Sequence, residues 1–340
     1  MDSHELSPWQ HENFMGHQEI DDYFRNAIDQ NKLHHAYLLH GTKGIGKCTF
    51  AFRLARYLFA LNHKQEAEPS LFGDVLSEPM KGLDSELPSG IKNQVELLHY
   101  PDLLYVSTDN PKFKSTNKTN VITVQMAREV SRFLQLSSSH EGWRVIIFDR
   151  FDTLTNSAQN AVLKILEEPP KNVIFLLLTA SPGYILQTIK SRCQKVFFSP
   201  LKAENLKLLL EKHFDDTPYY EAKLNKYAHY TQGSFGNLVR LIKHDGFEII
   251  EAFTQILEQF EPVKASDYLD KVKVNQDPIH YEMLLQIIEC WMSNKIKAGE
   301  DLDHWFALYD HYMMEIIGYQ NAHLDKKYIL LNFLNLSVFP

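Results

Sequence analysis

The chain has 340 residues, a formal net charge of -8 and 44% hydrophobic residues. This length allows two or three domains, and the apolar content is sufficient for packed cores. The acidic balance argues against a protein that grips many phosphates by itself, because such contacts depend on an excess of Lys and Arg. The three cysteines are widely spaced, which argues against a disulfide framework. The most apolar run, 173–180, is far shorter than a membrane helix, so we expect a cytoplasmic protein without a membrane partner.

Up to about residue 200, apolar strand-like runs alternate with helical patterns. The predicted strands are 36–40, 103–106, 144–149 and 173–180. The predicted helices are 47–61, 124–136 and 156–168, the last with Thr155 or Asn156 as its cap and Pro169-Pro170 as its stop. The segment 173–180 is the last clear strand. This alternation predicts a parallel sheet with helices on both faces.

Beyond residue 200 the predicted elements are helices alone. A helix is expected over 280–298, and its apolar face is formed by Leu284, Ile288, Trp291 and Met292. Two more helices are expected near 302–319 and 325–338. The segment 62–100, with prolines and scattered charge, is predicted to be a loop-like insertion. The predicted domains are an α/β domain at 1–199, a small helical domain at 200–244 and a helical bundle at 245–340.

A glycine-rich turn follows the first predicted strand. Gly41, Gly44 and Gly46 precede Lys47 in the sequence GTKGIGKC, which has the G-x-x-x-x-G-K spacing of a phosphate-binding P-loop. Glycines let backbone N–H groups surround phosphate oxygens, and the start of the following helix adds positive potential. Lys47 either contacts phosphate or forms only a salt bridge in an empty loop. The turn therefore allows weak ATP or ADP binding.

The end of this motif departs from the usual P-loop. Cys48 and Thr49 complete the candidate nucleotide-binding residues, but Cys48 stands where a Ser or Thr hydroxyl ordinarily ligates magnesium. A neutral thiol is a poor ligand for such a hard cation. We expect Cys48 to be a small buried residue, and Thr49 to lie one position too late along the helix to replace it. No metal site is predicted.

The predicted strand 144–149 carries the second half of an ATPase site. It ends in Asp149-Arg150, where an active ATPase is expected to have Asp-Glu. Asp149 is well placed to hold magnesium or magnesium-bound water. Arg150 stands in the place of the general base, and arginine cannot accept a proton from water. Asp152, two residues later, is not expected to compensate. Cys48 and Arg150 together predict that the chain does not hydrolyse ATP.

Three further sequence blocks are similar to one known family. They are LHHAYLLHG at 33–41, NAVLKILEEPP at 160–170 and SRC at 191–193. With the P-loop, these blocks resemble the bacterial clamp-loader subunits of the AAA+ family. The similarity extends from Phe14 to about residue 243, and the C-terminal helices match the family only in length and class.

This resemblance implies a fold and a set of partners. The implied fold is an α/β P-loop AAA+ domain with a parallel sheet, followed by a small helical lid domain and a C-terminal all-α collar bundle. The implied partners are gamma/tau-type motor subunits and a delta subunit, with the sliding clamp and primer–template DNA contacted through the complex. The chain is then expected to belong to the DNA polymerase III holoenzyme, a nucleotidyltransferase complex, without an ATPase activity of its own.

The resemblance also assigns roles to two single residues. Arg192, in the SRC block, corresponds to an arginine finger that enters the ATP site of a neighbouring subunit. The alternative is a structural arginine that caps a helix end or pairs with an acid. Thr179, at the end of the strand beside the P-loop, resembles a polar sensor-1 residue, although a β-branched residue is also common in strands.

Two further features separate this chain from other members of the family. Gly236 stands where active loader ATPases usually carry arginine, and Arg240, one turn later, is not expected to reach a phosphate. Family members usually have a four-cysteine zinc module within the region that corresponds to 62–100, but this segment contains no cysteine. His63 and His99 alone cannot form a tetrahedral structural site. We therefore predict no zinc and no required cofactor.

Three functions remain open from the sequence. The favoured one is a clamp-loader subunit that acts as a stator and supplies Arg192 in trans. The second is a catalytically active AAA+ ATPase, such as a motor-type loader subunit. The third is a binding module in which the P-loop is vestigial and Arg192 only structural.

Overall fold

The computed structural model describes residues 7–11, 14–66, 83, 89–114, 122–136, 142–214, 216–299, 301–322 and 325–338. The chain forms two compact units. The sheet unit is Met1–Leu209 with Gly233–Gly236, and the helical unit is Leu210–Gln232 with Asn237–Pro340. This division differs from the predicted boundaries near 199 and 244, so the three-part division stays a prediction.

A five-stranded parallel sheet forms the centre of the sheet unit, with the strand order β2-β3-β4-β1-β5. The strands are β1 (Ala36–His40), β2 (Leu103–Val106), β3 (Arg144–Phe148), β4 (Val173–Thr179) and β5 (Gln194–Phe197). The first four confirm the predicted strands. Strand β4 is the last strand with a clear apolar run, and β5, which the sequence does not predict, follows it. Among the described residues β5 pairs with β1 alone and is largely exposed, so its sequence QKVF lacks an apolar run.

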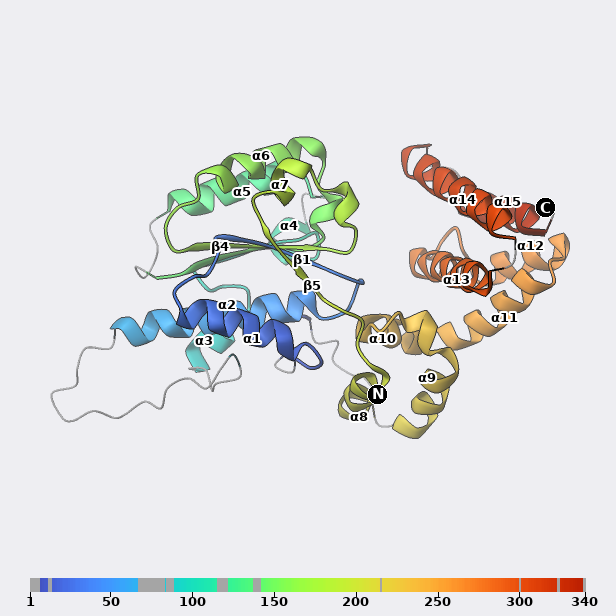
Figure 1. The fold of residues 1–340 in the computed structure, drawn as a ribbon, viewed down its shortest axis with the longest axis horizontal. Coiled ribbons are helices and arrows are strands. Elements are labelled where there is room, and N and C mark those ends of the chain that lie inside the picture. The colour runs from blue at the N-terminus through green and yellow to red at the C-terminus, as the bar shows by residue number, and fades with distance from the viewer. Residues whose placement is uncertain are drawn as a thin grey trace. The chain divides into compact units, whose positions relative to one another are not determined.

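Helices cover both faces of this sheet, as the alternating pattern predicts. On one face lie α5 (Val124–Gln135), α6 (Asn156–Glu167) and α7 (Gln187–Lys190), and on the other lie α1 (Gln18–Asp29) and α2 (Lys47–Glu66) (Figure 1). A short α4 (Pro111–Lys114) follows β2. Thr155 caps α6 by accepting a hydrogen bond from the backbone N–H of Ala158, which confirms the predicted start.

The predicted loop-like insertion at 62–100 is wrong at both of its ends. Helix α2 continues to Glu66, because apolar residues from Phe50 to Ala60 are buried, and Asn62 exchanges two hydrogen bonds with the backbone of Trp143. Helix α3 (Ser89–Glu96) lies before β2 and buries Ile91 and Val95. The segments 67–82 and 84–88, like the side chain of His63, lie outside the described residues.

Every described element of the helical unit is a helix. They are α9 (Thr217–Thr231), α11 (Gly246–Glu258), α12 (Pro262–Lys271), α13 (Pro278–Ala298), α14 (Leu302–Ala322) and α15 (Lys326–Val338), while α8 (Ala203–His213) and α10 (Phe235–Lys243) contain residues of both units. The predicted apolar face of α13 is confirmed, since its four residues are buried. Within the described residues, no helix combines the length and apolar character needed to span a bilayer.

Candidate functional site

The P-loop lies between β1 and α2, as the sequence predicts. Its three glycines have positive φ angles, and α2 begins at Lys47, so the N-terminus of the helix faces the loop. The Lys47 ammonium group donates to the backbone oxygens of Gly41 at 2.6 Å and Thr42 at 2.8 Å. Lys47 is therefore bound to the loop itself, and no surface salt bridge is needed to explain its position. Thr49 lies half-buried on α2.

Lys47 is a buried cation, with 9% of its surface exposed. Burial lowers its pKa to about 8, although nearby Asp149 and Asp152 act in the opposite direction. Because the ordinary pKa is 10.5, protonated Lys47 destabilises the folded state at neutral pH. This penalty is relieved as the pH rises through 8, since the unfolded chain then binds more protons than the folded chain.

This linkage gives a pH-dependent prediction. Relative to Lys47→Met, the wild-type free energy of unfolding is expected to increase by about 2 kcal/mol between about pH 7 and about pH 9.5. Denaturant titrations of the two proteins at the two pH values measure this difference. If the difference in the free energy of unfolding between the wild type and Lys47→Met is the same at both pH values, the result contradicts a lowered pKa of Lys47.

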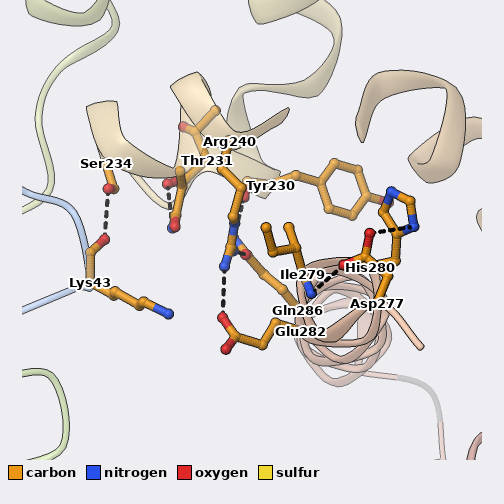
Figure 2. Close-up of polar contacts among 11 residues, drawn as sticks. Lys43, Tyr230, Thr231, Ser234, Arg240, Asp277, Ile279, His280, Glu282 and Gln286 are labelled. Carbon is orange, nitrogen blue, oxygen red and sulfur yellow. Dashed lines mark hydrogen bonds and ion pairs between the residues drawn. The ribbon is translucent and has the colours of Figure 1, made fainter. Parts of the chain in front are cut away.

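Residues 233–236 hold the P-loop from a second side. The Ser234 hydroxyl donates to the backbone oxygen of Lys43 at 2.7 Å (Figure 2), and the Gly236 N–H donates to the oxygen of Gly44 at 2.9 Å. A Cβ atom on Gly236 would lie only 2.7 Å from the Cα atom of Gly44. An arginine at position 236, as in active loader ATPases, is therefore incompatible with this arrangement.

The magnesium side of the loop is filled by protein groups. The Cys48 thiol donates to the Tyr105 hydroxyl at 3.9 Å, and that hydroxyl donates to Oδ2 of Asp149 at 3.1 Å. Burial raises the pKa of the Cys48 thiol well above its ordinary value, so the sulfur is not a thiolate ligand. Burial also raises the pKa of Asp149, and the hydrogen bond from Tyr105 opposes this change. These residues do not fit the magnesium ion that P-loop ATPases use.

The residues that would activate water are also altered. Arg150 follows β3 in a left-handed backbone conformation with a φ of 56°. Asp152 accepts a hydrogen bond from the Ser181 N–H at 3.0 Å, and the Thr179 hydroxyl accepts from the same N–H at 3.0 Å. Asp152 and Thr179 therefore share one backbone donor at the end of β4. Arg150 cannot act as the general base, because a guanidinium does not accept a proton from water.

Arg192 lies two residues after the end of α7, in the middle of the SRC block and next to Cys193. Its guanidinium donates to the backbone oxygen of Thr188 at 2.8 Å and to Oε1 of Glu167 at 3.0 Å. Glu167 ends α6 and belongs to the LEEPP block, so the two motifs meet through this ion pair. The Arg192 side chain remains 36% exposed. Burial raises the pKa of the Cys193 thiol to about 12, in agreement with an unreactive packed residue.

Arg240 is engaged within the helical unit. It donates to Oε2 of Glu282 at 3.1 Å and also contacts Gln286, both on α13 (Figure 2). Gln286 in turn donates to the backbone oxygen of Tyr230 at 2.6 Å. These contacts occupy the guanidinium and agree with the expectation that Arg240 does not serve a phosphate. Separately, the described residues contain no group of three or more His, Cys, Asp or Glu side chains that could hold a metal ion.

The strand order, the P-loop after β1 and the following helices define a P-loop protein of the AAA+ class. A family model described as "DNA polymerase III, delta subunit" matches residues 16–202, more than half of the chain. The chain belongs to this family, and the expected resemblance is confirmed at that level.

Several proteins from this replication system are similar to the chain. DNA polymerase III subunit gamma of Buchnera aphidicola is 28% identical over 68% of this chain and 57% of its own length. Subunit delta' of Bacillus subtilis is 33% identical over 52% of this chain and 46% of its own length. The chain thus spans about half the length of these curated relatives. A gamma subunit-related structure from Thermotoga maritima aligns with 93% of this chain and 98% of its own, with 16% identity and a TM-score of 0.48.

Proposed function

We propose that the chain is the delta-prime-type subunit of a bacterial clamp loader. It binds gamma/tau-type motor subunits and a delta subunit, and it does not hydrolyse ATP. As a stator, it supports its neighbours while they place the sliding clamp on primer–template DNA. It also presents Arg192 to the ATP site of an adjacent motor subunit.

The filled magnesium side of the P-loop carries this proposal. The Tyr105 hydroxyl lies between Cys48 and Asp149, so neither residue is available to a hydrated cation without breaking a hydrogen bond. Arg150 removes the general base independently. Phosphoryl transfer in P-loop ATPases depends on both functions. The loss of both functions favours a subunit that does not hydrolyse ATP itself and that assists hydrolysis by the neighbouring motor subunits.

The surroundings of Arg192 support a role in trans. An exposed ion pair such as that with Glu167 contributes little stability, typically below about 1 kcal/mol, so a stronger anion can displace the carboxylate. A transferring phosphate carries more charge and accepts bidentate hydrogen bonds from arginine. The Glu167 contact holds the guanidinium ready and leaves part of it accessible.

An exposed apolar stripe on α14 supports assembly through the C-terminal helices. Leu302, Phe306 and Tyr309 recur at helical spacing and are 43%, 53% and 39% exposed, whereas Leu308 and Tyr312 of the same helix are buried. Apolar side chains at this spacing on an outer helix face are suited to pack against another helix. We assign this stripe to the seam with the other loader subunits.

A motor-type ATPase is the second candidate, because all three P-loop glycines and Lys47 are in place. ATP turnover by the purified chain separates the two functions. We expect the wild-type rate to equal that of Lys47→Ala, because Tyr105 occupies Cys48 and Asp149 and because Arg150 stands in the place of the general base. Turnover that disappears in Lys47→Ala would instead establish an active ATPase.

A further inference from the structure

Tyr105 reaches the P-loop because of the register of the sheet. On β2 it pairs with Ile147 of β3, and Ile147 lies two residues before Asp149. Side chains two residues apart on a strand point to the same face, so Tyr105 and Asp149 both face α2. This is the helix that begins at the P-loop and carries Cys48 in its first turn.

Packing fixes the Tyr105 ring in this position. The side chain is only 3% exposed, and its ring lies 5.1 Å from the ring of Phe52 and 5.4 Å from that of Trp9. Arg56 on α2 donates to the backbone oxygens of Trp9 and His11, which ties the chain before α1 to this helix. The ring is therefore held from both the α2 side and the N-terminal side. Moving it would expose several aromatic surfaces.

We propose that Tyr105 excludes divalent metal from this P-loop, so that the loop accepts phosphate groups only in metal-free form. The inference rests on the proposed function, because it explains how a nearly complete P-loop can remain without hydrolysis. A ligand of this class is a nucleoside di- or triphosphate, or inorganic phosphate, without magnesium.

Coordination geometry explains the exclusion. Magnesium requires six oxygen ligands at about 2.1 Å in an octahedron and gives up its water reluctantly. In this chain the volume between residue 48 and Asp149 is bridged by a phenol oxygen at 3.9 and 3.1 Å from the two side chains. The Tyr105 hydroxyl donates its proton to Oδ2 of Asp149 and so occupies this carboxylate. Lys47 remains as the cation that can neutralise phosphate.

The test compares ATP affinity with excess magnesium and with a chelator, measured by calorimetry on the full chain. For the wild type, magnesium is expected to change the affinity by less than about threefold, or to weaken it. In the double variant Cys48→Thr/Tyr105→Phe, which supplies a hydroxyl and removes the phenol oxygen but keeps the ring, magnesium should tighten ATP binding at least about tenfold. Cys48→Thr alone should behave like the wild type, because the phenol still blocks the site.

Tyr37→Phe is the matched control, since Tyr37 is also buried on a strand of this sheet and its hydroxyl accepts a hydrogen bond from the His34 N–H. It should leave the magnesium response unchanged. If magnesium tightens ATP binding by the wild type, the proposal is overturned. This measurement uses only the wild-type chain, so it does not depend on the folding of any variant. A folded double variant that gains no magnesium response would also overturn it. If wild-type binding requires magnesium but no turnover follows, this inference fails, and the lack of hydrolysis in the proposed function then rests on Arg150 alone.

Discussion

Replacing Phe306 by Asp is expected to prevent this chain from joining a clamp loader while leaving the chain folded. Phe306 is 53% exposed in the centre of the α14 stripe, so an aspartate there meets water in the isolated chain. In a subunit seam, the same change removes an aromatic anchor and buries an unpaired charge. The affinity for the other loader subunits should fall at least about a hundredfold, or about 3 kcal/mol.

Size-exclusion chromatography with gamma/tau-type and delta subunits measures this loss, and thermal melting of the isolated chain tests its fold. Val263→Asp is the matched control. Val263 is 73% exposed on α12 of the same helical unit but is not part of the α14 stripe. Normal assembly by Phe306→Asp, or an equal defect in Val263→Asp, would remove α14 from the proposed seam.

Strands are predicted most reliably from the sequence where they are completely buried. Strands β1, β3 and β4 lie inside the sheet with both faces covered, so each appears as an apolar run. Strand β5 has an exposed edge and a polar sequence, and only its pairing with β1 makes it a strand. Helix α3 also depends on tertiary contacts, because packing of its buried residues Ile91 and Val95 stabilises it. The sequence around its start is charged and contains proline, so it carries no clear helix signal.

The candidate site is predicted in its composition but not in its contacts. The P-loop, Asp149 and Arg192 follow from local motifs, since each is defined within a few residues. Tyr105 is missed because its contact with Asp149 depends on the register between β2 and β3. Glu167 holds Arg192 across 25 residues of sequence, and no local motif predicts this contact. The joint presence of the LEEPP and SRC blocks is the one sequence signal that could have suggested this pair.

Replacing Arg192 by Ala is the second change with a large expected effect. A guanidinium that reaches the transferring phosphate stabilises charge that develops only in the transition state, and such a finger is worth about 10³–10⁵ in rate at its own site. In the isolated chain the substitution removes only an exposed ion pair and one helix-end contact. Folding and assembly should therefore be nearly unchanged, whereas hydrolysis by the neighbouring subunit should be lost.

The matched control is Arg132→Ala. Arg132 is an exposed arginine on α5 that also pairs with a glutamate, Glu129, and it belongs to neither the P-loop nor the SRC block. Its removal tests whether the loss of any surface arginine from the sheet unit affects the loader.

Clamp- and DNA-stimulated ATP turnover by the reconstituted loader, at equal assembly, measures whether Arg192 acts on the ATP site of a neighbouring subunit. With Arg192→Ala we expect turnover to fall at least about tenfold relative to both the wild type and Arg132→Ala. Unchanged turnover in a fully assembled Arg192→Ala loader would contradict the arginine finger and leave Arg192 as a structural partner of Glu167.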